Sequence, residues 1–103
     1  MIKRHILVIT CAIGLALSAI EAQAEVDKHA RNLAASCAAC HGTNGRSSGG
    51  TPVLAGMDKA MFVGAMKDFK SGARPATVMH QHAKGYSEAE FDLLAEFFAV
   101  QKR

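Results

Sequence analysis

Several familiar patterns are missing from this sequence. No run of alternating apolar and polar residues is long enough for a β-strand, and no segment is repeated along the chain. The 12 basic side chains are scattered among 9 acidic ones and form no basic stripe, which argues against a nucleic-acid-binding surface. No G-x-G-x-x-G fingerprint for a dinucleotide occurs. These absences leave a short all-α chain whose chemistry must come from another kind of motif.

The N-terminus has the organisation of an export signal. A basic start at residues 3–5 precedes an apolar stretch at residues 6–20, and the Ala-Gln-Ala sequence of residues 22–24 is a small-x-small cleavage site. The apolar stretch is too short for a comfortable membrane span. We therefore expect a signal peptide over residues 1–24, cleaved after Ala24, and a single periplasmic domain over residues 25–103 with no membrane span.

Cysteine is scarce, and its three positions are informative. Cys11 lies inside the apolar stretch and is expected to leave with the signal, so only Cys37 and Cys40 remain and no pair is left for a structural disulfide. These two thiols are three positions apart and are followed at once by His41, which is the spacing of a covalent haem c site. Each sulfur adds across one vinyl group of the porphyrin, and the imidazole becomes an axial ligand of the iron.

Two other chemistries use closely spaced cysteines. A thioredoxin-like dithiol opens a helix after a strand, and no strand-like run precedes this motif. A structural zinc site needs two further ligands, and His80 and His82 are closer together than a usual zinc pair. Because haem is attached to cysteines outside the cytoplasm, the export signal and the motif support each other. We expect one covalent haem c.

Hydrophobic periodicity predicts four short helices. The first three are expected over residues 27–36, 59–71 and 76–83, with Pro75 as the first residue of the third. The fourth follows Ser87. Aromatic residues on the last helix and small residues on the first imply that the N- and C-terminal helices cross and pack beside the haem.

The fourth helix has the clearest signals. Ser87 and Glu90 have the spacing of a capping box. An apolar stripe follows at the helical period, consisting of Phe91, Leu94, Ala95 and Phe98. Lys102 and Arg103 would place positive charge in the last turn, where it suits the helix dipole.

The far side of the haem iron needs its own ligand. Met79 is the best candidate, because it lies between the middle and C-terminal helices, where the chain can wrap over the porphyrin to the opposite face. Met66 falls on the apolar stripe of the 59–71 helix and is expected in the core. His80, His82 and the other methionines remain alternatives. A methionine ligand raises the reduction potential, whereas a second histidine lowers it.

Three motifs in this order resemble the class I c-type cytochromes. They are residues 37–42 (CAACHG), residues 51–56 (TPVLAG) and a methionine ahead of a capped C-terminal helix. The resemblance implies a class I cytochrome c fold around one covalent haem. It also implies that Met79 is the distal ligand and that the carbonyl of Pro52 accepts the Nδ1 proton of His41.

Residues 70–79 (KSGARPATVM) and 83–87 (AKGYS) are similar to the cytochrome subunit of flavocytochrome c sulfide dehydrogenase, and more loosely to cytochromes c4. This resemblance implies an electron-transfer subunit. A flavoprotein (FAD) chain would oxidise sulfide, the iron between His41 and Met79 would accept the electrons, and a small redox protein would remove them. A free diffusible periplasmic carrier is the alternative. A chain that is an enzyme by itself is disfavoured, because Met79 would close the coordination position.

Overall fold

A computed structural model of the chain describes residues 17–20 and 27–103, so the expected cleavage site lies outside the described residues. The described part contains helices and no strands, which confirms the all-α prediction. None of its helices is long and apolar enough to cross a membrane. Beyond residues 27–34, the elements are the 3-10 turn η1 (Ala35–Cys37), α2 (Ala38–His41), the 3-10 turn η2 (Thr43–Gly45), α3 (Lys59–Ser71), α4 (Met79–Lys84) and α5 (Glu88–Ala99).

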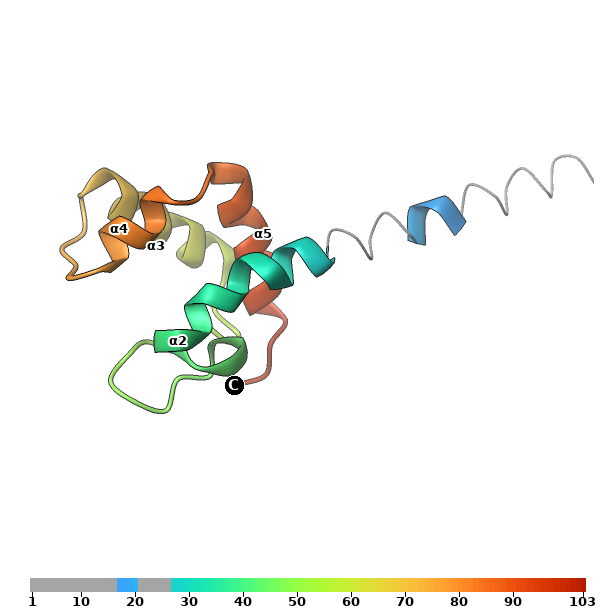
Figure 1. The fold of residues 1–103 in the computed structure, drawn as a ribbon, viewed down its shortest axis with the longest axis horizontal. Coiled ribbons are helices and arrows are strands. Elements are labelled where there is room, and N and C mark those ends of the chain that lie inside the picture. Colours follow the sequence, from blue (N-terminus) through green and yellow to red (C-terminus); the bar gives the residue numbers. More distant parts are fainter. Residues whose placement is uncertain (1–16, 21–26) are drawn as a thin grey trace, which may run out of the picture.

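The first helix does not stop at Ser36 as expected. Its helical backbone passes through η1 into α2, and it ends only at Gly42, whose φ of 79° no ordinary side chain favours. The expected haem motif therefore lies at the end of one nearly continuous helical rod. A long loop with the short turn η2 follows and leads to α3 (Figure 1).

The bounds of α3 agree with the prediction, because both ends carry local signals. Asp58 is the N-cap, and its carboxylate accepts a hydrogen bond from the amide of Met61 at 3.0 Å. Gly72 ends the helix in the left-handed conformation, with φ of 84°. Phe62 and Met66 are buried on its inner face, so the placement of Met66 in the core is confirmed.

The third helix begins later than expected. Pro75 is not its first residue, because α4 starts at Met79 after Val78, which gives no side-chain cap. The amide of Arg74 donates to the carbonyl of Asp68 at 3.2 Å and turns the chain away from α3. Residues 73–78 are exposed, so this segment has no buried side chain to anchor an earlier helical turn. The helix forms only where Ala83 can enter the core.

The last helix confirms the capping box. The Ser87 hydroxyl accepts from the Glu90 amide at 3.1 Å, and the Glu90 carboxylate accepts from the Ser87 amide at 2.7 Å. The expectation of a basic last turn is wrong, because α5 ends at Ala99 and both Lys102 and Arg103 lie beyond it.

The terminal helices cross as predicted (Figure 1). Ala30 and Ala34 are buried on the first helix, and Ala34 shares one core cluster with the apolar stripe of α5. Within that stripe, Phe91, Leu94 and Phe98 are the largest fully buried side chains. Full burial of such a side chain contributes roughly 1.5 to 3 kcal/mol relative to exposure. The small residues let the two helices approach closely enough for the aromatic rings to be enclosed.

Candidate haem-binding site

The two cysteines of the motif are both free thiols, placed on η1 and α2. Cys37 is partly buried and Cys40 is exposed. Burial raises the pKa of Cys37, and a hydrogen bond with Ser36 opposes this effect.

His41 is the one buried polar residue among the described residues, with 8% of its surface exposed. Its Nδ1 lies 2.8 Å from the carbonyl oxygen of Pro52. A carbonyl oxygen can only accept, so this contact requires the proton on Nδ1 and leaves a lone pair on Nε2. The imidazole therefore has one nitrogen committed to the protein and one available to a metal.

The loop that carries Pro52 is held by its own backbone. The carbonyl of Gly45 accepts from the amides of Leu54 and Ala55 at 2.9 and 3.1 Å. Gly45 itself is buried with φ of 77°, and a Cβ built there would lie 2.8 Å from the Leu54 Cβ and 2.9 Å from the Phe98 ring. Only glycine allows this close approach, which joins the two ends of the loop and fixes the position of Pro52.

The end of the chain also contacts this loop, which the sequence analysis missed. Arg46 Nε donates to the carbonyl of Lys102 at 2.6 Å, and Arg103 Nε donates to the carbonyl of Ala55 at 3.1 Å. The amide of Gly56 donates to the carbonyl of Phe98 at 2.8 Å. No local pattern could have revealed these contacts, because the partners are some 40 to 56 residues apart.

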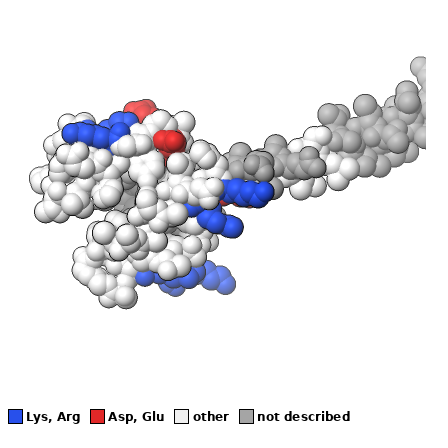
Figure 2. Space-filling model, in the orientation of Figure 1, with Lys and Arg blue, Asp and Glu red and all other residues white. Residues whose placement is uncertain are grey.

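The part of the loop after Arg46 has no charged residue of its own. Residues 47–57 contain no Asp, Glu, Lys or Arg. In Figure 2 the left side of the lower part of the molecule shows no charged side chain, whereas Lys and Arg side chains lie along its bottom edge, beside the N-terminal segment and at the upper edge. The charged side chains beside this stretch therefore belong to other residues, among them Arg46, which precedes it, and Arg103, which contacts Ala55.

Met79 is the first residue of α4 and is partly buried against the core cluster. Figure 1 shows α4 and α2 in two separate parts of the molecule, so Met79 and His41 come from different parts. Among the alternatives, Met66 is in the core and Met61 is 64% exposed. His82 is exposed as well.

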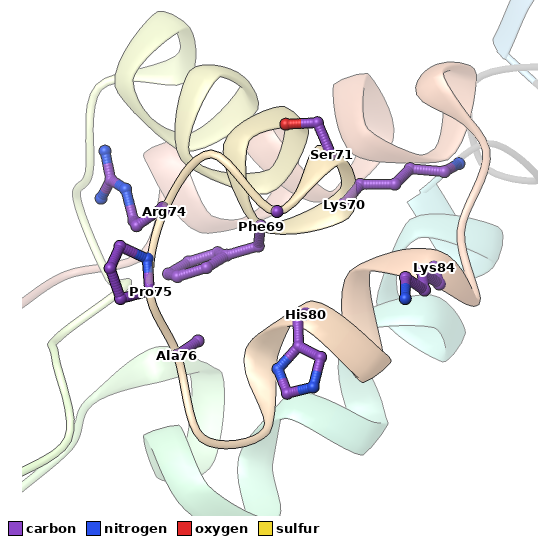
Figure 3. Close-up of a pocket in the computed structure, with 9 residues that line it drawn as sticks. Phe69, Lys70, Ser71, Arg74, Pro75, Ala76, His80 and Lys84 are labelled. Carbon is purple, nitrogen blue, oxygen red and sulfur yellow. The ribbon is translucent and has the colours of Figure 1, made fainter.

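His80 lies beside Met79 on α4, and its Nδ1 is buried with no hydrogen-bond partner. Figure 3 shows its imidazole at a pocket that also includes Phe69 and Pro75. Met79 and His80 are therefore the two potential iron ligands that the described part of the chain places at the start of α4.

The residues present fit a covalent haem. Two free thiols lie on one helical segment, a buried imidazole keeps Nε2 available, and a partly buried thioether lies on another element. Imidazole nitrogen and thioether sulfur form the axial pair of cytochrome-type iron. Over residues 17–20 and 27–103, no three side chains of the His, Cys, Asp or Glu type are grouped as a bare metal ion would require.

Comparison with known proteins defines the class. The cytochrome c family model matches residues 27–100. The chain therefore belongs to the cytochrome c family and is a c-type haem protein of electron transfer.

Individual relatives are more specific. The chain is 48% identical over 66 residues to the cytochrome subunit of sulfide dehydrogenase from Chlorobaculum tepidum, an alignment that covers 64% of this chain and 60% of that protein. It is 38% identical over 68 residues to a thiosulfate dehydrogenase electron acceptor from Stutzerimonas stutzeri, and this alignment covers 64% of this chain and 32% of that protein. It is 35% identical over 72 residues to cytochrome c-553 from Helicobacter pylori, and this alignment covers 68% of this chain and 75% of that protein. The expected resemblance to a sulfide dehydrogenase cytochrome subunit is confirmed, although the chain spans less than two thirds of the first two relatives.

Proposed function

We propose that this chain is the electron-transfer subunit of a sulfide dehydrogenase. In this role it accepts electrons from a FAD-containing flavoprotein chain that oxidises sulfide, and it passes them to a small redox protein. The observation that carries the proposal is the 48% identity to the cytochrome subunit of sulfide dehydrogenase. A free diffusible carrier is the second candidate, because the likeness to cytochrome c-553 covers 75% of that protein.

The residues of the site have separate tasks in this proposal. Cys37 and Cys40 would hold the haem through two thioether bonds, and His41 and Met79 would be the protein ligands of the iron. The carbonyl of Pro52, 2.8 Å from Nδ1, keeps the imidazole in one orientation and makes Nε2 a better donor. The bound haem supplies a one-electron iron couple. The thioether of Met79 favours the ferrous state and so raises the reduction potential.

The proposed location is the periplasm. Residues 1–24 have the pattern of a cleaved signal peptide, and cysteine attachment of haem takes place outside the cytoplasm. The mass of the protein isolated from the periplasmic fraction tests this assignment. A holoprotein that begins at Glu25 supports it, and one that retains residues 1–24 contradicts it.

The subunit proposal is tested by purifying the native protein without an affinity tag. We expect a flavin-containing chain to co-purify, and we expect sulfide to reduce the haem in the isolated complex. A haem-loaded monomer that neither sulfide nor the flavoprotein reduces would contradict the proposal. A monomer that exchanges electrons with several small redox proteins would favour the free carrier.

The ligand assignment is tested by the weak sulfur-to-iron charge-transfer absorption of the oxidised holoprotein. We expect Met79→Ala to abolish this band, while His80→Ala and the exposed control Met61→Ala keep it. A band that persists in Met79→Ala would rule out Met79. Carbon monoxide binding to the reduced wild type would show an open coordination position and favour an enzyme.

A further inference from the structure

Tyr86 is the single tyrosine of the chain and lies in the short connection between α4 and α5. Its phenol oxygen is 2.6 Å from the hydroxyl of Ser36, the residue directly before Cys37. The same phenol donates to the carbonyl of Leu33 at 3.3 Å. One side chain therefore fastens the α4–α5 connection to the helical segment that leads into the haem motif.

The backbone of Tyr86 is held from two other elements. Lys70 of α3 donates from Nζ to the carbonyl of Tyr86 at 2.5 Å, and the same ammonium lies 5.3 Å from the centre of the Phe91 ring. Figure 3 shows the Lys70 side chain extending from α3 toward the connection that follows α4. The amide of Tyr86 donates to the carbonyl of Ala83 in α4 at 3.3 Å. Tyr86 thus joins the first helix, α3 and α4 at one point.

These contacts matter because α4 is short and has no side-chain cap. It has only six residues, no side-chain cap at its start, and an exposed segment before it. A helix this short is not stable by its own backbone hydrogen bonds. Its tertiary contacts are its packing against α3, which includes the fully buried Ala83 and the partly buried Met79, and the hydrogen bonds of Tyr86 just beyond its end. Met79 lies at the opposite end of the same short helix.

We propose that Tyr86, with Ser36 and Lys70, forms a clamp that holds α4 in place and thereby keeps Met79 on the iron. Tyr86 is a positioning residue, since it acts on the ligand through α4. The inference rests on the proposed function, because it requires Met79 to be the distal ligand. Loss of the clamp makes displacement of Met79 by an external ligand easier without changing the ligand itself.

Imidazole is a suitable probe, because its binding to the oxidised holoprotein requires Met79 to leave the iron. Tyr86→Phe removes only the phenol hydroxyl, and Ser36→Ala removes the partner of the same hydrogen bond. We expect Ser36→Ala, which loses one hydrogen bond of the phenol, to bind imidazole about five-fold more tightly than the wild type, and Tyr86→Phe, which also loses the bond to Leu33, to bind it at least as tightly as Ser36→Ala. The double variant should bind no more tightly than Tyr86→Phe alone, because that single variant already removes the hydrogen bond between Ser36 and Tyr86.

Lys70→Met tests the backbone anchor, since it keeps an unbranched apolar side chain and removes both the donor to Tyr86 and the ammonium beside the Phe91 ring. It should shift imidazole affinity in the same direction. Ser87→Ala is the matched control, because it destabilises the neighbouring helix α5 while leaving the contacts of Tyr86 in place. We expect Ser87→Ala to lower thermal stability and to leave imidazole affinity within two-fold of the wild type.

Two results would overturn the inference in distinguishable ways. If Met79→Ala abolishes the charge-transfer band but Tyr86→Phe and Ser36→Ala bind imidazole like the wild type, the ligand assignment holds and the clamp does not exist. The clamp also fails if Ser87→Ala raises imidazole affinity as much as Tyr86→Phe, because general destabilisation then explains both. If Met79→Ala keeps the band, the ligand assignment itself is wrong, and with it the role given to Tyr86.

Discussion

The two sides of the site are held by different means. On the side of His41, the loop over residues 42–56 is closed on itself through Gly45 and is fastened to the end of the chain by Arg46 and Arg103. On the side of Met79, residues 73–78 are exposed, and α4 begins without a side-chain cap. The loop on the His41 side is therefore closed by hydrogen bonds at both ends, whereas the segment that leads to Met79 is exposed.

This contrast fits the tasks of the two proposed ligands. A histidine that must stay on the iron in both oxidation states gains from a fixed orientation, which the Pro52 carbonyl provides. If Met79 is the second ligand as proposed, its thioether would influence the reduction potential, so small movements of α4 would change that potential. The local stability of a segment follows from its buried contacts and hydrogen bonds, and the segment before α4 has few of them.

The largest effect should come from preventing attachment of the haem, which is proposed to bind both His41 and Met79. We expect the Cys37→Ala/Cys40→Ala variant, which cannot attach haem, to lose most of its cooperative unfolding transition. The domain is too small to bury a large core, and a covalent porphyrin adds an apolar body between the two sides. Circular dichroism during heating measures this. A variant that melts cooperatively near the temperature of the holoprotein would show that the two sides pack without haem.

A pair of glycine substitutions compares the two sides directly. Gly45→Ala places a Cβ 2.8 Å from Leu54 and also requires a left-handed alanine, with φ of 77°. We expect it to lower the free energy of unfolding by about 3 kcal/mol, from strain and overpacking together. Gly72→Ala, at φ of 84° but with no atom within 4 Å, has only the backbone strain. It should cost about 1 kcal/mol.

Denaturant unfolding of both holoproteins measures this difference. Equal losses of stability in the two variants would mean that the close packing around Gly45 contributes nothing. That result would remove the main structural distinction between the loop at His41 and the connection before α4.

The parts of this fold that were predictable from the sequence are those with local signals. The bounds of α3 follow from Asp58 and Gly72, and the start of α5 follows from the capping box of Ser87. The start of α4 was not predictable, because no local cap marks it and its position depends on where Ala83 reaches the core. In such a segment tertiary packing decides the structure over propensity.

In the candidate site, too, only the residues marked by a local sequence pattern were predictable. The cysteines and histidine were identified from spacing alone, because their chemistry requires neighbouring positions in the chain. The contacts of Arg46 with Lys102 and of Ser36 with Tyr86 join residues 56 and 50 positions apart. Nothing in a local pattern specifies such pairs, so the supports of the site became visible only in the structure.

The contacts between the chain end and the loop at His41 should have an intermediate effect. The double variant Arg46→Ala/Arg103→Ala removes two side-chain hydrogen bonds to backbone carbonyls, and we expect a loss of about 1 to 2 kcal/mol. The charge-transfer band should be unchanged, because α4 is not involved. Lys102→Ala is the control, since Lys102 contributes only its carbonyl and the change should be neutral. A band that weakens in the double variant would mean that the two sides are mechanically coupled.

The smallest effect should come from adding a side-chain cap at the start of α4. Val78 is the N-cap of α4, is 50% exposed and has no side-chain acceptor. Val78→Thr has nearly the same shape and adds a hydroxyl that can accept from the first amides of the helix. Because the ψ of Val78, −24°, is not that of a usual N-cap, we expect a gain of only about 0.5 kcal/mol. The readout is a two-fold weaker binding of imidazole to the oxidised protein, with Val78→Ala as the control. If Val78→Thr stabilises the protein without weakening imidazole binding, then the start of α4 does not limit the displacement of Met79. The resistance of Met79 to displacement would then come from the other contacts of α4, among them those of Ala83 and Tyr86.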